Sequence, residues 1–256
     1  MKTSLRAGLR VWALAALMAA PGVARADEAL VAVAANFAGT VEVIGNEFAK
    51  DTGHIIQVTT GATGKLYAQI KEGAPFAILL SADEKTPAKL EDEGAGVTGS
   101  RFTYALGKLT LWSGDAGRIG EDPKAALTAA DTLHVAIANP DLAPYGVAAR
   151  EALTEMGLWD TIQPKIVMGE NIGQTFSMVE SGAAQMGFIA TSAIEMPGGT
   201  AKGSRYDVPQ DMFAPIKQDA VLLKAGESNA AAKAFLDYLK GDKAKAIIAS
   251  FGYGTE

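Results

Sequence analysis

The chain has 256 residues, of which 48% are hydrophobic and none is cysteine. This length and apolar content suffice for two α/β lobes or one large domain. The absence of cysteine excludes disulfide bonds, thiolate ligands of a metal ion and a cysteine nucleophile. The formal net charge of −6 argues against nucleic acid as a partner.

Residues 1–26 have the pattern of a secretory signal peptide. Basic residues stand among the first ten positions, an apolar run follows at residues 11–20, and Ala24-Arg25-Ala26 forms a small-x-small cleavage signal. The apolar run is too short to span a bilayer. We therefore expect an exported, periplasmic protein whose mature chain begins near Asp27. A short uncleaved anchor is the alternative.

Export changes the charge balance. Four of the 23 basic residues and none of the acidic ones precede residue 27, so the mature chain has 19 basic and 29 acidic residues, a net charge of −10. An anion that binds to such a chain is held by local dipoles and donors, because net charge does not attract it.

Strand and helix patterns alternate along the mature chain, which is typical of an α/β fold with mostly parallel sheets. Apolar runs predict strands at residues 29–34, 55–58, 76–80, 134–138 and 186–190. Residues 106–112 and 208–223 are interpreted as segments that cross between two lobes. A helical region at residues 229–248, broken at Gly241, closes the chain.

Four strand-to-helix junctions carry small or polar residues, near Asn36, Thr63, Tyr145 and Ile172. In open α/β sheets, ligands bind beyond the carboxyl ends of the strands. A helix that begins there presents free N–H groups and the positive end of its dipole to an anion. Thr63 is expected at or near a helix N-cap, and the Asn36 side chain is expected to cap a helix or donate to a ligand. Ordinary helix capping without a ligand is the alternative at these two junctions.

Several kinds of chemistry are disfavoured by the residues present. Gly64-Lys65 is followed by Leu66, where a phosphate-binding P-loop needs Ser or Thr. The two histidines, His54 and His134, are neither spaced as metal ligands nor placed beside a Gly-x-Ser-x-Gly motif. We therefore expect neither an enzyme nor a cofactor.

The donor types favour an anion that carries no proton. Asn36, Thr63, Tyr145 and backbone N–H groups all donate, and Asp141 and Glu170 only flank the junctions. Phosphate keeps a proton at neutral pH, so its site usefully includes an acceptor. Sulfate, molybdate and tungstate offer acceptors only.

Eight short motifs are spread over the mature chain. They are VAANF at residues 33–37, GATGKLYAQI at 61–70, GAPF at 73–76, SAD at 81–83, ANP at 138–140, PYG at 144–146, GLWD at 157–160 and YLK at 238–240. Together they make the chain similar to the periplasmic molybdate-binding proteins, the substrate-binding components of molybdate ABC transporters.

The resemblance implies a two-lobed periplasmic-binding-protein fold of type II, an α/β fold with mixed, mostly parallel sheets and a ligand cleft between the lobes. Lobe 1 would comprise residues 27–107 and 213–256, and lobe 2 would comprise residues 108–212. Two crossing segments would join them and allow hinge closure.

The resemblance also implies the ligand contacts. Lobe 1 would contribute the Ala35 backbone, Asn36 and Thr63, and lobe 2 would contribute Tyr145 and the backbone N–H of Ile172. The metal atom would be held only as an oxyanion, without direct protein–metal ligands. Many relatives have Ser or Thr where Ala35 stands, and some have a ligand Tyr where this chain has Ala190. We expect the Tyr145 hydroxyl to supply the missing donor.

We therefore expect a monomeric, non-enzymatic receptor that binds molybdate and tungstate in the periplasm and delivers them to a membrane permease. The alternatives are the same fold selective for sulfate or chromate, a periplasmic hydrolase, and a sensor domain that binds a partner protein.

Overall fold

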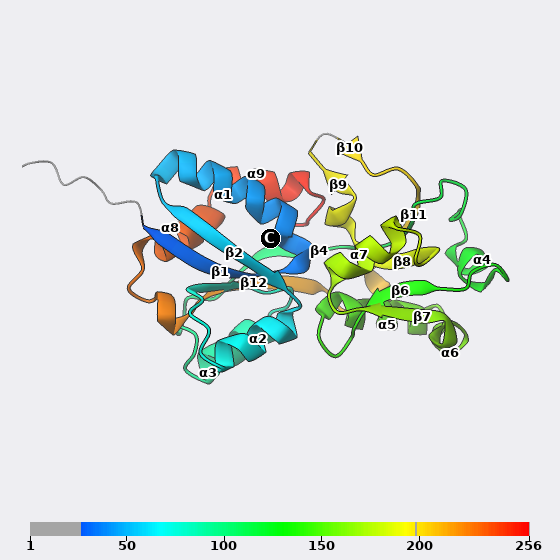
Figure 1. Cartoon of the computed structure of the whole chain (residues 1–256), viewed down its shortest axis with the longest axis horizontal. Coiled ribbons are helices and arrows are strands. Elements are labelled where there is room, and N and C mark those ends of the chain that lie inside the picture. Colours follow the sequence, from blue (N-terminus) through cyan, green and yellow to red (C-terminus); the bar gives the residue numbers. More distant parts are fainter. Residues whose placement is uncertain (1–26, 198, 256) are drawn as a thin grey trace, which may run out of the picture.

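The computed structural model describes residues 27–197 and 199–255. Their strands form two five-stranded sheets and one two-stranded ribbon, with helices on both faces of each large sheet (Figure 1). The predicted signal peptide at residues 1–26 lies outside the described residues. No helix within the described ranges is long and apolar enough to cross a membrane.

The first sheet has the strand order β2-β1-β3-β12-β4. Its strands are β1 (Glu28–Ala34), β2 (Ile55–Gly61), β3 (Ile78–Leu80), β4 (Phe102–Gly107) and β12 (Ile216–Leu222). The pairs β1–β2 and β1–β3 are parallel, and β12 is antiparallel to both β3 and β4. Four of the five strands therefore run in one direction, and β12 alone runs against them.

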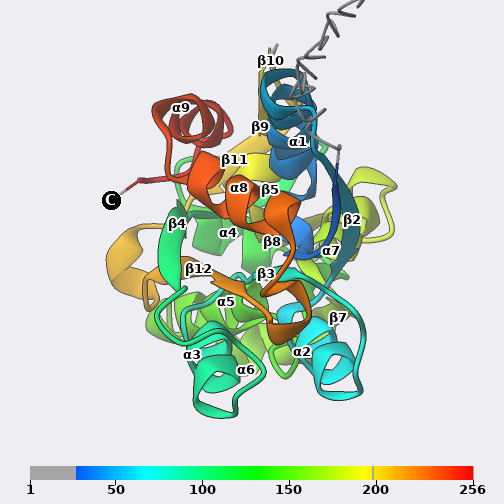
Figure 2. The ribbon, with the colours of Figure 1, turned by 90° about the vertical axis from the view of Figure 1, so that its left-hand side faces the viewer.

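Five helices cover the first sheet. They are α1 (Ala38–Thr52), α2 (Thr63–Lys71), α3 (Lys85–Asp92), α8 (Ala230–Leu239) and α9 (Asp242–Ser250). Figure 2 shows α1, α8 and α9 on one side of this sheet and α2 and α3 on the other. Phe48 of α1 packs edge-to-face on Phe235 of α8 at a centroid distance of 5.2 Å, and Leu66 and Leu90 fill the core on the α2–α3 side.

The second sheet has the order β11-β5-β8-β6-β7. Its strands are β5 (Leu109–Ser113), β6 (Val135–Ala138), β7 (Ile166–Gly169), β8 (Met186–Ala190) and β11 (Ser204–Asp207). Here β6 is parallel to β7 and β8, whereas β5 is antiparallel to β8 and β11. Again four strands share one direction. The predicted α/β class with mixed, mostly parallel sheets is confirmed.

The helices of the second sheet are α4 (Pro123–Thr128), α5 (Pro144–Glu155), α6 (Trp159–Ile162) and α7 (Ile172–Glu180). Side chains of β6 alternate between the two faces of the sheet. Val135 and Ile137 belong to the core that includes α5, and Ala136 belongs to the core that includes Val179 of α7. The sheet is therefore buried on both faces, as its continuous apolar strands predict.

Short elements complete the described residues. They are the 3₁₀ turns η1 (Ala35–Phe37), η2 (Gln163–Lys165), η3 (Thr191–Ala193), η4 (Gln210–Met212) and η5 (Lys224–Gly226), and the ribbon strands β9 (Glu195–Met196) and β10 (Gly199–Thr200).

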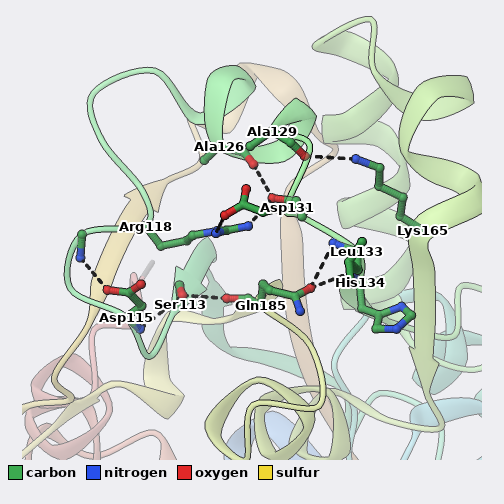
Figure 3. A network of polar contacts seen from close by, with 12 residues as sticks. Ser113, Asp115, Arg118, Ala126, Ala129, Asp131, Leu133, His134, Lys165 and Gln185 are labelled. Atoms are coloured by element: carbon green, nitrogen blue, oxygen red, sulfur yellow. Dashed lines mark hydrogen bonds and ion pairs between the residues drawn. The ribbon is translucent and has the colours of Figure 1, made fainter.

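Polar contacts fasten the long connection between β5 and β6 (Figure 3). The Arg118 guanidinium pairs with Asp131 at 2.7 Å and donates to the Thr132 hydroxyl at 2.6 Å. The side-chain oxygen of Gln185 accepts from the backbone N–H groups of Leu133 and His134, at 3.2 and 2.7 Å. This loop is therefore held by side chains in the absence of strand pairing.

We use lobe 1 for the first sheet with its helices and lobe 2 for the second. The chain passes from β4 to β5 through Lys108 alone, and it returns from β11 to β12 through residues 208–215. The boundaries 27–107 with 213–256, and 108–212, remain our proposal for the extents of the lobes.

Two predicted strands differ from the structure by two residues or more. The strand expected at residues 76–80 is only Ile78–Leu80. The strand expected at residues 55–58 continues to Gly61, because residues 59–61 keep their parallel pairing with residues 32–34 of β1. The turn before α2 is therefore shorter than predicted and consists of Ala62.

Gly146 in the first turn of α5 allows this helix to begin directly on the end of β6. A Cβ atom at this position would overlap the carbonyl oxygen of Ala138 and lie 2.8 Å from the nitrogen of Pro140. Backbone atoms can retreat only if the helix moves, so the side chain of alanine has no room here.

We predict that Gly146→Ala lowers the free energy of unfolding by about 2 kcal/mol or more, measured by urea denaturation. The gain in helix propensity from Gly to Ala, about 1 kcal/mol, is smaller than the cost of the overlap. Gly120→Ala is the control, since a Cβ atom there meets nothing within 4 Å. Equal stabilities of the two variants would contradict the assigned packing.

Candidate ligand-binding site

The five residues predicted as ligand contacts line one small cavity between the two lobes. The cavity is narrow: the space open to the centre of a water-sized group is about 10 Å³, within an empty volume of about 200 Å³ that is partly open to solvent. The lining residues are Ala34, Ala35, Asn36, Gly61, Ala62, Thr63, Ala82, Ala143, Pro144, Tyr145, Asn171 and Ile172. The topology brings these residues together because β1, β2, β6 and β7 each end beside the cavity.

Helix starts surround the cavity. The helices α2, α5 and α7 begin at Thr63, Pro144 and Ile172. N–H groups in the first turn of a helix have no acceptor within the helix. Those of Thr63, Tyr145 and Ile172 also have no acceptor elsewhere among the described residues. Three helix dipoles thus present their positive ends, with free donors, to one small volume.

Asn171 explains why the N–H of Ile172 stays free. Asn171 is the N-cap of α7, and its Oδ1 atom accepts from the backbone N–H of Gln174 at 2.9 Å. The cap thus engages an N–H group further along the first turn, and the N–H of Ile172 is left for another acceptor.

Thr63 is the first residue of α2 and directly follows the N-cap, Ala62, which agrees with its predicted place at or near the N-cap, but the Thr63 side chain does not cap the helix. Its hydroxyl instead accepts from the backbone N–H of Ala82 at 3.2 Å. A hydroxyl that accepts one bond still has a proton to donate. The Thr63 side chain is 2% exposed, and it is therefore held in place as a donor at the cavity.

The Asn36 side chain neither caps α1 nor has a free N–H. Asn36 lies in the 3₁₀ turn that precedes α1, and no side chain caps that helix. Its Nδ2 atom donates to Oε1 of Gln218 at 2.7 Å and to the Tyr253 hydroxyl at 3.1 Å. Its Oδ1 atom is buried without a partner among the described residues. The side chain of Asn36 therefore anchors the turn, and both of its N–H groups are already engaged.

The Tyr145 hydroxyl lies beneath the cavity, against the strands that join the lobes. It accepts from Nε2 of Gln218 at 3.4 Å. A Cβ atom on Gly107, the last residue of β4, would overlap it, so this close approach needs glycine. The hydroxyl proton has no acceptor among the described residues.

A buried polar network joins these residues, and the sequence reasoning missed most of it. Tyr104 donates to Oε1 of Gln218 at 3.2 Å and to the carbonyl of Ser81 at 2.9 Å. Tyr253 and Ser192 both donate to the carbonyl of Asn36, at 2.7 and 3.1 Å. The interpretation of residues 208–223 as a crossing segment did not single out Gln218, which the structure places in β12.

The two lobes touch around the cavity. The N–H of Gly64 in lobe 1 donates to the carbonyl of Leu142 in lobe 2 at 2.9 Å. Lys65 and Glu170 form an exposed ion pair across the lobes at 2.8 Å. Lys65 is therefore engaged at the rim, where solvent screens its charge.

The residues that line the cavity have no charged side chain. Within the described ranges, no group of three or more His, Asp or Glu residues is arranged to hold a metal ion. Burial raises the pKa of Tyr104 and of Tyr145 well above the ordinary value, and it raises the pKa of Tyr253 to about 12. These phenols stay neutral at physiological pH. The site can therefore donate hydrogen bonds to an anion without a charged side chain.

A wider cleft of about 410 Å³ adjoins the cavity and shares Thr63, Ala82, Ala143 and Pro144 with it. Its other walls include charged residues of both signs, and Asp83 and Glu151 are two of the acidic ones. Nothing in the sequence indicated this second hollow between the lobes.

Comparisons with known proteins give one consistent relationship. Residues 29–254 match the family described as bacterial extracellular solute-binding protein. The molybdate-binding protein ModA of Rhodobacter capsulatus is 47% identical over 99% of this chain and 98% of its own length. ModA of Azotobacter vinelandii is 47% identical over 91% and 92%. The solved structure of the Azotobacter vinelandii periplasmic molybdate-binding protein superposes with a TM-score of 0.86, at 43% identity, over 89% of this chain and 99% of that one.

The buried phenols predict how stability depends on alkaline pH. Tyrosine in an unfolded chain titrates near pH 10, whereas the pKa of Tyr253 in the folded chain is about 12. Above pH 10 the folded state binds more protons than the unfolded state. The ionisation of Tyr253 therefore lowers the free energy of unfolding by about 1.4 kcal/mol per pH unit between pH 10 and pH 12.

We predict that the free energy of unfolding of Tyr253→Phe falls less steeply with pH, by the contribution of about one titrating proton. Urea denaturation between pH 8 and pH 11.5 measures this difference. The variant loses hydrogen bonds and is less stable at pH 8, but the slope reports only the missing titration. Parallel curves for the two proteins would show that Tyr253 titrates normally in the folded state.

Proposed function

The chain belongs to the family of bacterial extracellular solute-binding proteins, and we propose that it binds molybdate outside the cytoplasmic membrane for delivery to the permease of an ABC transporter. The observation that carries this proposal is the uncharged cavity, where donors from the starts of three helices and from Thr63 converge. Relatives named molybdate-binding protein, identical at nearly half of all positions over almost the whole chain, support the same conclusion.

The proposed ligand contacts are Ala35, Asn36, Thr63, Tyr145 and Ile172. The backbone N–H groups of Thr63, Tyr145 and Ile172 are free, and the Thr63 hydroxyl has a proton to donate. A hydrogen bond to a charged group contributes about 1.5–3 kcal/mol. Several such bonds hold a dianion without a basic side chain, and the metal atom has no direct protein ligand.

The chemistry of the donors extends the proposal to tungstate, which has the same charge, the same tetrahedral arrangement of acceptors and nearly the same size as molybdate. Sulfate and chromate are smaller, and a site fixed by backbone donors cannot shrink freely to fit them. A site composed of donors disfavours phosphate, which carries a proton at neutral pH and would need an acceptor. We propose that the receptor has no enzymatic activity and no cofactor. We further propose that it acts as a monomer in the periplasm, because both lobes must face the permease.

A thermal melt of the mature, dialysed protein tests this function. A ligand that binds only the folded state raises the melting temperature by mass action. We predict a rise with molybdate and with tungstate, and little change with sulfate, phosphate or chromate at equal concentration. A rise with sulfate or chromate instead would change the substrate and keep the receptor. No rise with any anion would leave the hydrolase and partner-binding alternatives.

Thr63 provides a matched pair of variants. Thr63→Ala removes the hydroxyl at the cavity and is predicted to weaken molybdate binding by about 1.5–3 kcal/mol, measured by titration calorimetry. Thr63→Ser keeps the hydroxyl and should bind within a few-fold of the natural protein. Unfolding of both variants is measured as well, because the hydroxyl also accepts from Ala82. An unchanged affinity of the alanine variant would remove Thr63 from the site.

A further inference from the structure

Gln218 is a fully buried amide in β12, the strand that follows the second crossing between the lobes. The pairing of β12 with β4 shifts its register between Gln218 and Asp219. A buried amide is costly unless its polar atoms are bonded. Gln218 meets this requirement, and it does so with residues from both lobes.

The two ends of the Gln218 side chain serve different lobes. Its Oε1 atom accepts from Nδ2 of Asn36 at 2.7 Å and from the Tyr104 hydroxyl at 3.2 Å, both in lobe 1. Its Nε2 atom donates to the Tyr145 hydroxyl in lobe 2 at 3.4 Å. One amide therefore connects Asn36 and Tyr145, which line the cavity, although Gln218 itself does not line it.

The direction of these bonds matters for an anion. Because Nε2 donates, the Tyr145 oxygen is the acceptor and its proton is not used on Gln218. Because Oε1 accepts, the Asn36 amide is fixed with its nitrogen toward Gln218. The amide is also uncharged, so it adds no negative charge beneath a site that holds a dianion.

We propose that Gln218 is a positioning residue for the oxyanion site, which orients Asn36 and Tyr145 from the two lobes and keeps the floor of the cavity electrically neutral. The proposal rests on the proposed function, since it concerns the affinity of the same site for a dianion. It adds to that function a residue outside the cavity on which affinity depends.

Gln218→Glu tests the proposal with almost no change in shape. The variant keeps an acceptor for Asn36 and Tyr104, but it replaces the donor to Tyr145 with an acceptor and introduces a carboxyl group that can ionise. We expect the affinity for molybdate to fall by about tenfold or more at pH 9. The loss should shrink as the pH is lowered to 6.5, because protonation restores a neutral group with a donor.

The pH profile separates this role from a merely structural one. The affinity of the natural protein should stay flat from pH 6.5 to pH 9, because its cavity has no group that titrates there. A damaged fold would weaken binding equally at every pH. Titration calorimetry with molybdate alone, in buffers of different ionisation enthalpy, should also detect proton uptake on binding for Gln218→Glu and none for the natural protein.

Gln185→Glu is the matched control. Oε1 of Gln185 likewise accepts two hydrogen bonds, here from backbone N–H groups, but Gln185 contacts the β5–β6 loop of lobe 2 and does not line the cavity (Figure 3). The control should retain the affinity and the flat pH profile. If Gln218→Glu does not fold, Gln218→Met replaces it, and we expect a loss of about tenfold at all pH values.

These experiments distinguish a failure of the proposed function from a failure of the positioning role of Gln218. If the natural protein binds none of the tested oxyanions, the proposed function fails. If it binds molybdate but Gln218→Glu binds equally well, or loses affinity to the same extent at every pH, the positioning role of Gln218 is overturned. If Gln218→Met folds and binds molybdate with the affinity of the natural protein, the positioning role of Gln218 is also overturned.

Discussion

A doubly charged anion can be buried without a basic partner only where many neutral donors converge on it, and the arrangement of this chain follows from that requirement. Free N–H groups occur where helices begin. The helices α2, α5 and α7 begin around one cavity, and each directly follows a strand or a short loop. The carboxyl ends of the strands in one sheet must therefore face those in the other sheet across the cavity. This arrangement needs two lobes, and the chain crosses between them twice.

Close backbone approach is the second consequence. The first turn of α5 lies against the end of β6 only because residue 146 is glycine, and the Tyr145 hydroxyl reaches the joining strands only because residue 107 is glycine. Charge is kept out of the same region. Asp219, next to Gln218, is paired with Arg101 and accepts from Thr103, each at 2.7 Å. The polar network beneath the cavity is left with amides, hydroxyls and phenols.

Much of this arrangement could be predicted from the sequence, because it depends on local patterns. The apolar runs predicted five of the strands, β1, β2, β3, β6 and β8, and the small residues near their ends located junctions that the structure brings to one cavity. The detailed roles could not be predicted. Whether Asn36 caps a helix or bonds to residues 218 and 253 depends on contacts 182 and 217 positions apart. The full length of β2 could not be predicted either, because residues 59–61 belong to the strand only through their pairing with β1.

The most direct test of this account is a crystal structure of the mature protein grown with molybdate, with the metal located by its anomalous scattering. The account predicts one anomalous peak in the cavity between Thr63, Tyr145 and Ile172, with the oxygens within hydrogen-bond distance of backbone N–H groups and the Thr63 hydroxyl. A peak beside a lysine or arginine elsewhere, or in the wider adjoining cleft, would contradict it.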